Sequence, residues 1–204
     1  MEPVNLAIIY YSATGSVHAL ARAAAEGAEK AGATVRLRKV RELAPAEAIN
    51  ANPAWAQHIK DTADIAEASL DDLGWADAVL LGTPTRFGNP ASQLRAYLET
   101  TGPLWAQGKL ADKVCSVFTA SNTLHGGQES TILALSNTFY HWGGVMVPPG
   151  YTDPVQFQTG NPYGTSHVAG QGAPSEETLQ SARHQARRVV DIAAALKAGR
   201  AAAG

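Results

Sequence analysis

The sequence has little cysteine, no long apolar run and no signal for export. Its single cysteine, Cys115, cannot form an internal disulfide and stands in the apolar stretch KVCSVFTA, where a buried, unreactive thiol is expected. No uninterrupted apolar run reaches the roughly 20 residues of a membrane span, and the first residues, MEPVN, have neither a basic nor an apolar signal region. We therefore expect a cytoplasmic protein without stable membrane anchoring.

The sequence also lacks a marked excess of charge. Its 16 basic and 18 acidic residues give a formal net charge of -2. This balance favours neither nucleic-acid binding nor attraction to an anionic membrane, so small molecules or other subunits are the expected partners. The length of 204 residues allows a full hydrophobic core, and we predict a single domain over residues 1–204.

Short apolar and β-branched runs alternate with segments of helical periodicity. The predicted strands are Leu6–Tyr10, Thr34–Leu37, Ala78–Leu81, Val114–Thr119 and Val145–Val147. The first predicted helix begins at Val17 and stops at Gly32. The later ones are Ala91–Trp105, with a break near Gly102-Pro103, Gln128–His141 and Ser175–Leu196. This alternation predicts an α/β fold with an open parallel sheet covered by helices on both faces.

Two segments are longer than the connections of such a fold require. They span Pro45–Leu73 and the Gly/Pro-rich stretch Pro148–Pro174. Long segments of this kind inside a compact domain are uncommon unless they are functional. We interpret both as insertions that contribute to a binding surface.

Hydroxyl side chains and a glycine follow the first predicted strand, in Ser12-Ala13-Thr14-Gly15-Ser16. Ligands of open parallel sheets bind beyond the carboxyl ends of the strands, and a neutral loop before a helix N-terminus suits a phosphate monoester. The loop matches neither G-x-x-x-x-G-K-[ST] nor G-x-G-x-x-G, which disfavours a magnesium-bound triphosphate and the usual dinucleotide fold. We predict no metal site. The alternative that Ser12 or Ser16 only caps the helix stays open.

The third and fourth predicted strands also end in unusual loops. Gly82–Pro90, with two prolines and two glycines, suits main-chain hydrogen bonding to a flat polar heterocycle, with Arg86 beside a ring that becomes anionic on reduction. A rigid turn with solvated Arg86 and packed Phe87 is the alternative. Thr119–Glu129 again combines hydroxyls and glycines before a helix. Three such loops at one edge predict one extended ligand across it.

Together these loops resemble the WrbA-type NAD(P)H:quinone oxidoreductases of the flavodoxin-like superfamily. The family's GTPTRFGN stands at Gly82–Asn89 and its GGQE at Gly126–Glu129, and LW, VPPGY and NPYG follow in the family's order. The resemblance implies a flavodoxin-like three-layer sandwich, with a five-stranded parallel sheet in the order 2-1-3-4-5. It also implies bound FMN, a homotetramer, and two-electron reduction of quinones by NADH or NADPH with ping-pong kinetics.

The resemblance also implies roles for individual residues. The FMN phosphate would be held by Ser12, Ala13, Thr14, Gly15, Ser16 and Val17. The isoalloxazine ring would be held by Thr83, Pro84, Thr85, Arg86, Phe87, Gly88 and Asn89. The other side of the ring and the ribityl chain would be contacted by Thr119, Ala120, Ser121, Asn122, Thr123 and Gly126. His141 would reach the flavin of a neighbouring subunit, and Trp105 would border the substrate cavity. No residue is assigned a certain catalytic role, although protonation of the quinol by His141 or Tyr151 is a hypothesis.

The sequence departs from the family pattern at four positions. Thr14 and Ser16 stand where the family has an aromatic residue and a histidine, so Thr14 occupies the place of a nicotinamide contact. Asn122 and Leu124 replace a glycine and a polar residue, and we expect Asn122 to preserve the loop by adopting a left-handed backbone.

Purely structural roles for single residues, and a second function for the protein, remain as alternatives. His141 is also explained as a cap at a helix C-terminus, and Trp105 as core or interface packing. The alternative function is a flavodoxin that carries single electrons between proteins, but a net charge of -2 offers little of the acidic docking face that such carriers need. The two insertions also favour a covered cavity. A hydrolase is disfavoured because no G-x-S-x-G elbow is present.

Overall fold

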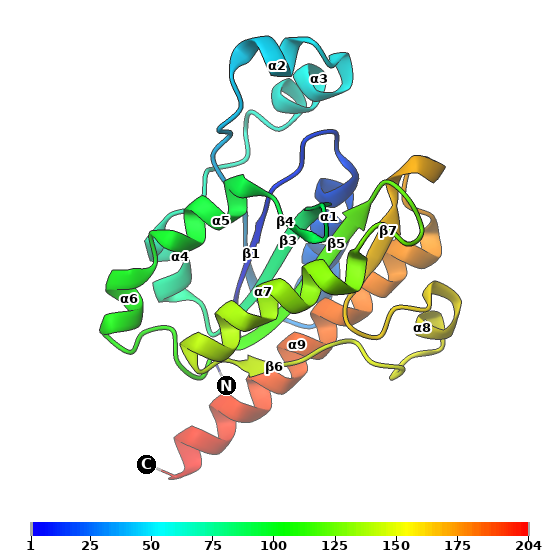
Figure 1. Cartoon of the computed structure of the whole chain (residues 1–204). Helices are drawn as coiled ribbons and strands as arrows, with labels where there is room; N and C mark the ends of the chain where they lie inside the picture. Colours follow the sequence, from blue (N-terminus) through cyan, green and yellow to red (C-terminus); the bar gives the residue numbers. More distant parts are fainter. Residues whose placement is uncertain (1, 204) are drawn as a thin grey trace.

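A parallel β-sheet lies at the centre of the molecule, with helices on both of its faces (Figure 1). The computed structural model describes residues 2–203. The main strands are β1 (Asn5–Tyr10), β2 (Thr34–Lys39), β3 (Ala78–Arg86), β5 (Val114–Ser121) and β6 (Val145–Met146), in the order β2-β1-β3-β5-β6. Because β5 and β6 are the fourth and fifth predicted strands, the predicted flavodoxin-like order 2-1-3-4-5 is confirmed.

The sheet has two further short strands that the sequence did not predict. β4 (Asn89–Pro90) pairs antiparallel with the end of β3. β7 (Ser166–Val168) lies parallel to the carboxyl end of β5, whereas β6 lies beside its start. The fifth place in the sheet is therefore filled by two pieces of chain. Val147, the residue after β6, still donates its N–H to the carbonyl of Cys115, but Pro148 and Pro149 follow it, and because proline has no N–H to donate, the ladder stops there.

Alternating side chains of β1 divide the core into two layers. Leu6, Ile8 and Tyr10 face α1 (Ser16–Lys30) and α9 (Glu176–Ala203). Ala7 and Ile9 face the opposite layer, which contains α4 (Leu70–Trp75), α5 (Ser92–Glu99), α6 (Gly102–Ala106) and α7 (Gln128–Trp142). This is the predicted sandwich of helices, sheet and helices. None of the helices within residues 2–203 combines the length and the apolar character that a bilayer span requires.

The predicted helices are present with shifted ends. The predicted segment Ala91–Trp105 is divided into α5 and α6 at the expected break, with Pro103 in the first turn of α6. The N–H of Thr178 donates to Ser175 Oγ at 3.3 Å, so Ser175 caps α9 as predicted. That helix continues to Ala203, beyond the predicted end at Leu196.

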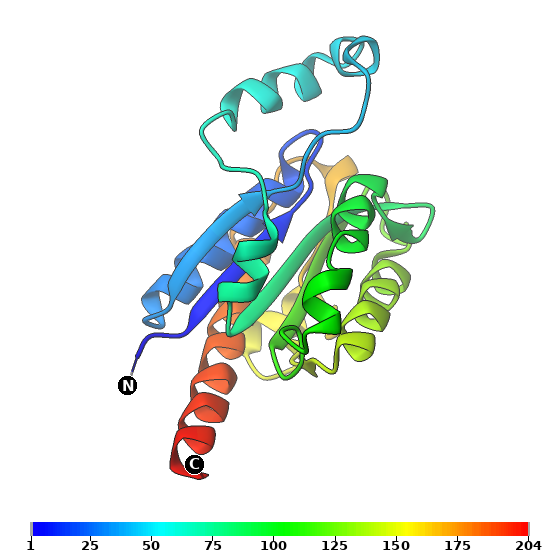
Figure 2. The same ribbon diagram turned by 90° about the vertical axis from the view of Figure 1, so that its left-hand side faces the viewer.

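Both predicted insertions contain regular structure. Residues 45–73 form α2 (Ala46–Asn50) and α3 (Pro53–Asp61) before α4. Figures 1 and 2 show α2 and α3 standing beyond the carboxyl edge of the sheet. Residues 148–174 contain α8 (Pro154–Thr159), β7 and the 3₁₀ turn η1 (Ala169–Gln171). The second insertion is therefore partly a strand of the central sheet.

Candidate functional site

The loop after β1 leaves the N-terminus of α1 open. Gly15 is the N-cap and has a left-handed backbone with φ of +103°, which favours glycine. Its N–H donates to Ser12 Oγ at 3.1 Å. Within residues 2–203, no side chain accepts a hydrogen bond from the first-turn N–H groups of α1, and the first turn has no acidic residue. Neither Ser12 nor Ser16 caps these groups, so the N–H groups of the first turn are available to bind an anion.

The loop after β3 is a tight turn with a fully exposed aromatic at its tip. Arg86 pairs with Asn89 across the turn, and Phe87 and Gly88 have φ of +52° and +76°. A left-handed conformation is strained for phenylalanine, and the side chain gains no burial in return because it is fully exposed. The alternative with a packed Phe87 is therefore wrong. The side chain of Asn89 donates to the carbonyl of Phe87 at 3.1 Å.

The first turn of α7, which follows the loop after β5, packs against β3 and the turn after it. Ser130 Oγ donates to the carbonyl of Gly88 at 3.1 Å, and the hydroxyls of Thr131 and Thr85 are 2.6 Å apart. Asn122 is not left-handed, since Phe87 and Asp112 are the non-glycine residues with positive φ in the described part of the chain. That expectation is wrong. The loop is held instead by the carbonyl of Asn122, which accepts from the N–H of Gly170 at 3.1 Å.

The three loops line one pocket of about 190 Å³ at the carboxyl edge of the sheet. The lining residues are Ser12, Ala13, Thr14, Ser16 and Val17 after β1, Pro84, Thr85 and Arg86 of β3, Ala120, Ser121 and Asn122 around the end of β5, and Ala169 of η1. Ala169 was missed by the sequence reasoning, and its only local signal is its place directly after the short run SHV.

Some predicted site residues lie beneath or beside this pocket. Thr83 and Thr119 are buried and join neighbouring strands, since Thr119 Oγ1 donates to the carbonyl of Thr83 at 2.7 Å. The residues Gly15, Phe87, Gly88, Asn89, Thr123 and Gly126 belong to the same loops without lining the pocket. The loops therefore contribute backbone shape as well as contacts.

His141 and Trp105 are far from the pocket of their own chain. Their rings stack with centroids 5.8 Å apart and planes at 29°. His141 is in the last turn of α7, and Gln128 begins that helix at the site. At a rise of about 1.5 Å per residue, His141 lies about 20 Å away along the helix. Tyr151 does not line the pocket either, and its hydroxyl donates to the carbonyl of Gly160 at 3.3 Å.

The first insertion adds residues that the sequence reasoning missed. A cavity of about 140 Å³ lies behind the loop after β1 and is lined in part by Tyr10, Ser12, Lys39 and His58. Burial, with a smaller contribution from the neighbouring His58, lowers the pKa of His18 to about 4. Trp55 and His58 are three residues apart in α3, a spacing that places them on one helix face and that would have indicated a contact surface.

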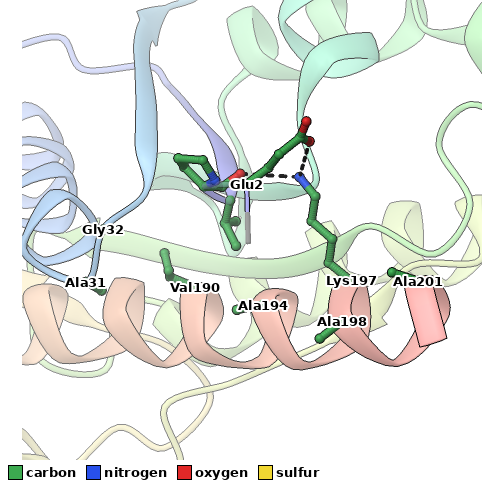
Figure 3. Close-up of a pocket in the computed structure, with 10 residues that line it drawn as sticks. Glu2, Ala31, Gly32, Val190, Ala194, Lys197, Ala198 and Ala201 are labelled. Atoms are coloured by element: carbon green, nitrogen blue, oxygen red, sulfur yellow. Dashed lines mark hydrogen bonds and ion pairs between the residues drawn. The ribbon is translucent and has the colours of Figure 1, made fainter.

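A larger apolar pocket of about 400 Å³ lies at the opposite edge of the sheet. Figure 3 shows it between the residues before β1, the end of α1 and the C-terminal half of α9. Its charged groups are already engaged, since Lys197 Nζ lies 2.9 Å from Asp77 and 3.9 Å from Glu2. It contains none of the hydroxyl and glycine loops, and we do not assign the activity to it.

Comparisons with known proteins agree with this geometry. Residues 5–156 match the family model described as NADPH-dependent FMN reductase. The chain is 48% identical to an NAD(P)H dehydrogenase (quinone) of Deinococcus radiodurans, over 95% of this chain and 98% of that one. It is 45% identical to an enzyme of the same name from Geotalea uraniireducens, over 95% and 99% of the two chains.

A solved structure supports the same relationship. The flavodoxin, WrbA-like protein from Agrobacterium tumefaciens has 26% identity and a TM-score of 0.65, with 94% of this chain and 98% of that one covered. An archaeal flavodoxin at 16% identity has a TM-score of 0.61 over 93% and 99% of the two chains, which shows the shared fold alone. From the family model and the full-length relatives, this chain belongs to the NADPH-dependent FMN reductase family.

Proposed function

We propose that the protein is an FMN-dependent oxidoreductase that reduces quinones by two electrons with NADH or NADPH. One observation carries this proposal: three loops from separate strands line a single pocket at the carboxyl edge of the sheet. An open helix N-terminus stands at one part of that pocket and a rigid turn with Arg86 at another. A phosphate monoester joined to a flat ring matches this arrangement.

The residues present fit the FMN phosphate. The N–H groups of the first turn of α1 have no side-chain acceptor within residues 2–203, and Thr14 and Ser16 add hydroxyls beside them. We propose that Ser12, Ala13, Thr14, Gly15, Ser16 and Val17 bind the phosphate, as the helix dipole and the N–H donors favour an anion. Thr14 also takes the place of a nicotinamide contact in this proposal.

The other two loops fit a flat heterocycle. We propose that Thr83, Pro84, Thr85, Arg86, Phe87, Gly88 and Asn89 hold one part of the ring and that Thr119, Ala120, Ser121, Asn122, Thr123 and Gly126 hold another. The contact of Ser130 at the start of α7 with Gly88 fixes the turn after β3 relative to the helix that follows the other loop before any ligand enters. Preorganised backbone donors of this kind cost little reorganisation during a reaction.

The chain's own contribution to the reaction is binding, orientation and charge. FMN, when bound, supplies reversible two-electron chemistry that amino-acid side chains lack. Arg86, whose Nη1 donates to the carbonyl of Thr85 at 3.1 Å, places a positive charge at the pocket and favours negative charge developing there. We propose that the nicotinamide and the quinone bind in turn at one place beside the bound flavin ring, which predicts ping-pong kinetics.

We further propose that the protein is a single domain that acts in the cytoplasm as a homotetramer. His141 and Trp105 support this assembly because they stack about 20 Å from their own pocket, where a neighbouring chain's pocket can meet them. Leu133 and Tyr140 on the same helix are large and exposed, as expected of an interface. Gel filtration tests the assembly, and a monomer would remove His141 from any role near FMN.

The test of the function is steady-state oxidation of NADH and of NADPH with a benzoquinone, with and without added FMN. We expect turnover that depends on FMN, one quinone reduced per nicotinamide oxidised, and parallel double-reciprocal plots. Absence of FMN-dependent turnover with both nicotinamides would contradict the enzyme. It would favour the alternative, a flavodoxin-type carrier of single electrons.

A further inference from the structure

Helix α3 of the first insertion places a histidine against the proposed phosphate loop. A Cβ built on Gly15 would lie 3.7 Å from His58 Nδ1. The ring of His58 packs on that of His18 with centroids 5.4 Å apart, and His18 Nδ1 lies 2.6 Å from the hydroxyl of Tyr10. An unbroken series of contacts therefore joins the insertion, the first turn of α1 and the end of β1.

Burial disfavours the charged form of both imidazoles in the protein without ligand. Burial is the main cause that lowers the pKa of His58 and also the pKa of His18, which falls to about 4. The charges that face the pair come from Lys39 of β2, Arg22 of α1, and Asp61 and Asp64 at and after the end of α3. Their signs are mixed, so burial decides the protonation state.

The phosphate loop itself contains no positive side chain. Residues 12–17 read SATGSV, and Lys39 Nζ is already engaged with the carbonyl of Thr62 at 2.5 Å. A phosphate dianion at the open N-terminus of α1 would bring negative charge close to a pair of titratable rings. An adjacent anion favours the charged form of an imidazole.

We propose that His58, packed against His18, is a positioning residue for the phosphate of FMN. His58 takes up a proton as the phosphate binds and so supplies the positive charge that the loop lacks. This rests on the proposed function. In this proposal the first insertion holds the phosphate loop at Gly15, and its effect on phosphate binding depends on the protonation of His58.

The sign of the pH dependence follows from linkage. Because burial lowers the pKa of both rings in the free protein and a bound anion raises it, FMN binding is coupled to proton uptake, and His58 should strengthen binding more as pH falls. The second ionisation of a phosphate monoester, with a pKa of about 6, acts in the opposite direction. The comparison must therefore be between variants at each pH.

The experiment measures FMN dissociation constants by flavin fluorescence quenching at pH 6, 7 and 8. It uses the full-length apoprotein, His58→Gln, and the matched control Lys60→Gln, which removes an exposed charge from the same helix. If binding raises the pKa of His58 by about one unit from a value below 6.5, His58→Gln weakens FMN binding by at most about eightfold at pH 6 and by less than about 1.5-fold at pH 8. Lys60→Gln should change it by less than about twofold.

Riboflavin, which lacks the phosphate, is the second arm. His58→Gln should leave riboflavin affinity unchanged at every pH. A loss that is equal at all three pH values, or equal for riboflavin and FMN, would overturn the proposal and leave His58 a packing residue. If the unaltered protein binds FMN and His58→Gln binds it equally well, only this inference is contradicted. If the unaltered protein does not bind FMN, the proposed function is contradicted.

A measurement without any variant covers the case in which His58→Gln does not fold. The imidazole resonances of the unaltered protein are titrated by NMR with and without FMN. We expect the midpoint of His58 to rise when FMN is present and to stay low with riboflavin. An unchanged midpoint would overturn the proposal.

Discussion

The two inserted segments both reach the carboxyl edge of the sheet, the first through α2 and α3 and the second through β7 and η1, but they are attached in different ways. Residues 148–174 return to the sheet through β7 and contain fully buried polar residues such as Gln156 and Thr165. α2 and α3 of the first insertion contain no buried residue. The second insertion is therefore part of the core, whereas the first is a cover whose position depends on a few surface contacts.

One side chain makes several of the hydrogen bonds that hold each segment, Gln185 for the second insertion and Glu42 for the first. Gln185 of α9 accepts from the N–H of Thr165 at 2.8 Å and donates to Ser116 Oγ and the carbonyl of Val117 at 2.6 and 2.8 Å, all in the core. Glu42, before α2, accepts from Tyr11, Trp55 and Gln93 at 2.9, 3.1 and 2.8 Å, where water has access. Similar bonds should therefore be worth more in the second insertion than in the first.

The largest expected effect is that of Gly164→Ala. A Cβ there would lie 2.1 Å from the carbonyl oxygen of Val117, so the backbone of a central strand must move. We expect a loss of at least about 3 kcal/mol in the free energy of unfolding, because overpacking against the backbone cannot relax. The melting temperature should fall by about 6–12 °C, at roughly 2–4 °C per kcal/mol for a chain of this size.

The control for that change is Gly74→Ala in α4. A Cβ there has nothing within 4 Å, and alanine is favoured over glycine in a helix by about 0.5–1 kcal/mol. The melting temperature should stay the same or rise slightly. Equal losses in both variants would contradict overpacking against Val117 as the cause of the loss in Gly164→Ala.

The next effect compares two glutamines, Gln185→Leu and Gln93→Leu. The first leaves the N–H of Thr165 and the carbonyl of Val117 buried without this partner, so we expect a loss of about 2–3 kcal/mol. The second removes bonds to Glu42 and Tyr11 that water can replace, which costs about 0.5–1 kcal/mol. Denaturant unfolding measures both losses. A larger loss for Gln93→Leu would reverse the comparison.

The sequence predicted the parts of the fold that have local signals. The run Leu6–Tyr10 followed by a hydroxyl loop and an alanine-rich helix indicated β1 and α1, because strand and helix periods differ. β7 was missed because three residues, Ser166–Val168, are too short to show a period and stand among glycines and prolines. Its pairing with β5 depends on a tertiary contact.

The candidate site shows the same division. The motif at residues 82–89 indicated a rigid turn from its letters alone, since glycines and prolines mark fixed backbone shapes. The predicted strand end at Leu81 was wrong, because β3 continues to Arg86 and the turn itself is Phe87-Gly88. His58 was missed because nothing local shows that α3 lies against Gly15, 43 positions earlier in the chain. Asn122 was given the wrong backbone because asparagine only tolerates a left-handed conformation and does not require one.

A smaller effect is expected for Glu42→Gln, and it depends on pH. Burial alone would raise the pKa of Glu42, but hydrogen bonds from Ala44, Gln93, Tyr11 and Leu43 outweigh it and lower the pKa below its ordinary value of 4.5. The ionised carboxylate therefore adds stability that is present above that value and is lost as pH falls through the lowered pKa.

The variant should lose about 1 kcal/mol or less at pH 7, since the group is partly solvated. The loss should shrink below pH 4. Denaturant unfolding at pH 7 and pH 3.5 measures it, and a loss that grows at low pH would contradict the assigned cause. Amide exchange of residues 46–61 should become faster while that of β7 stays unchanged.

The smallest expected effect is that of Trp55→Phe, which tests whether the first insertion moves as a unit. The substitution keeps an aromatic ring and removes the indole N–H that donates to Glu42 at 3.1 Å, so global stability should fall by less than about 1 kcal/mol. Trp55 and His58 share one helix, so loosening this contact should weaken FMN binding at pH 6 by a smaller factor than His58→Gln does. Fluorescence titration of both variants measures the two factors. An effect of Trp55→Phe on riboflavin equal to that on FMN would mean that α3 acts on the ring end of the pocket rather than on the phosphate loop.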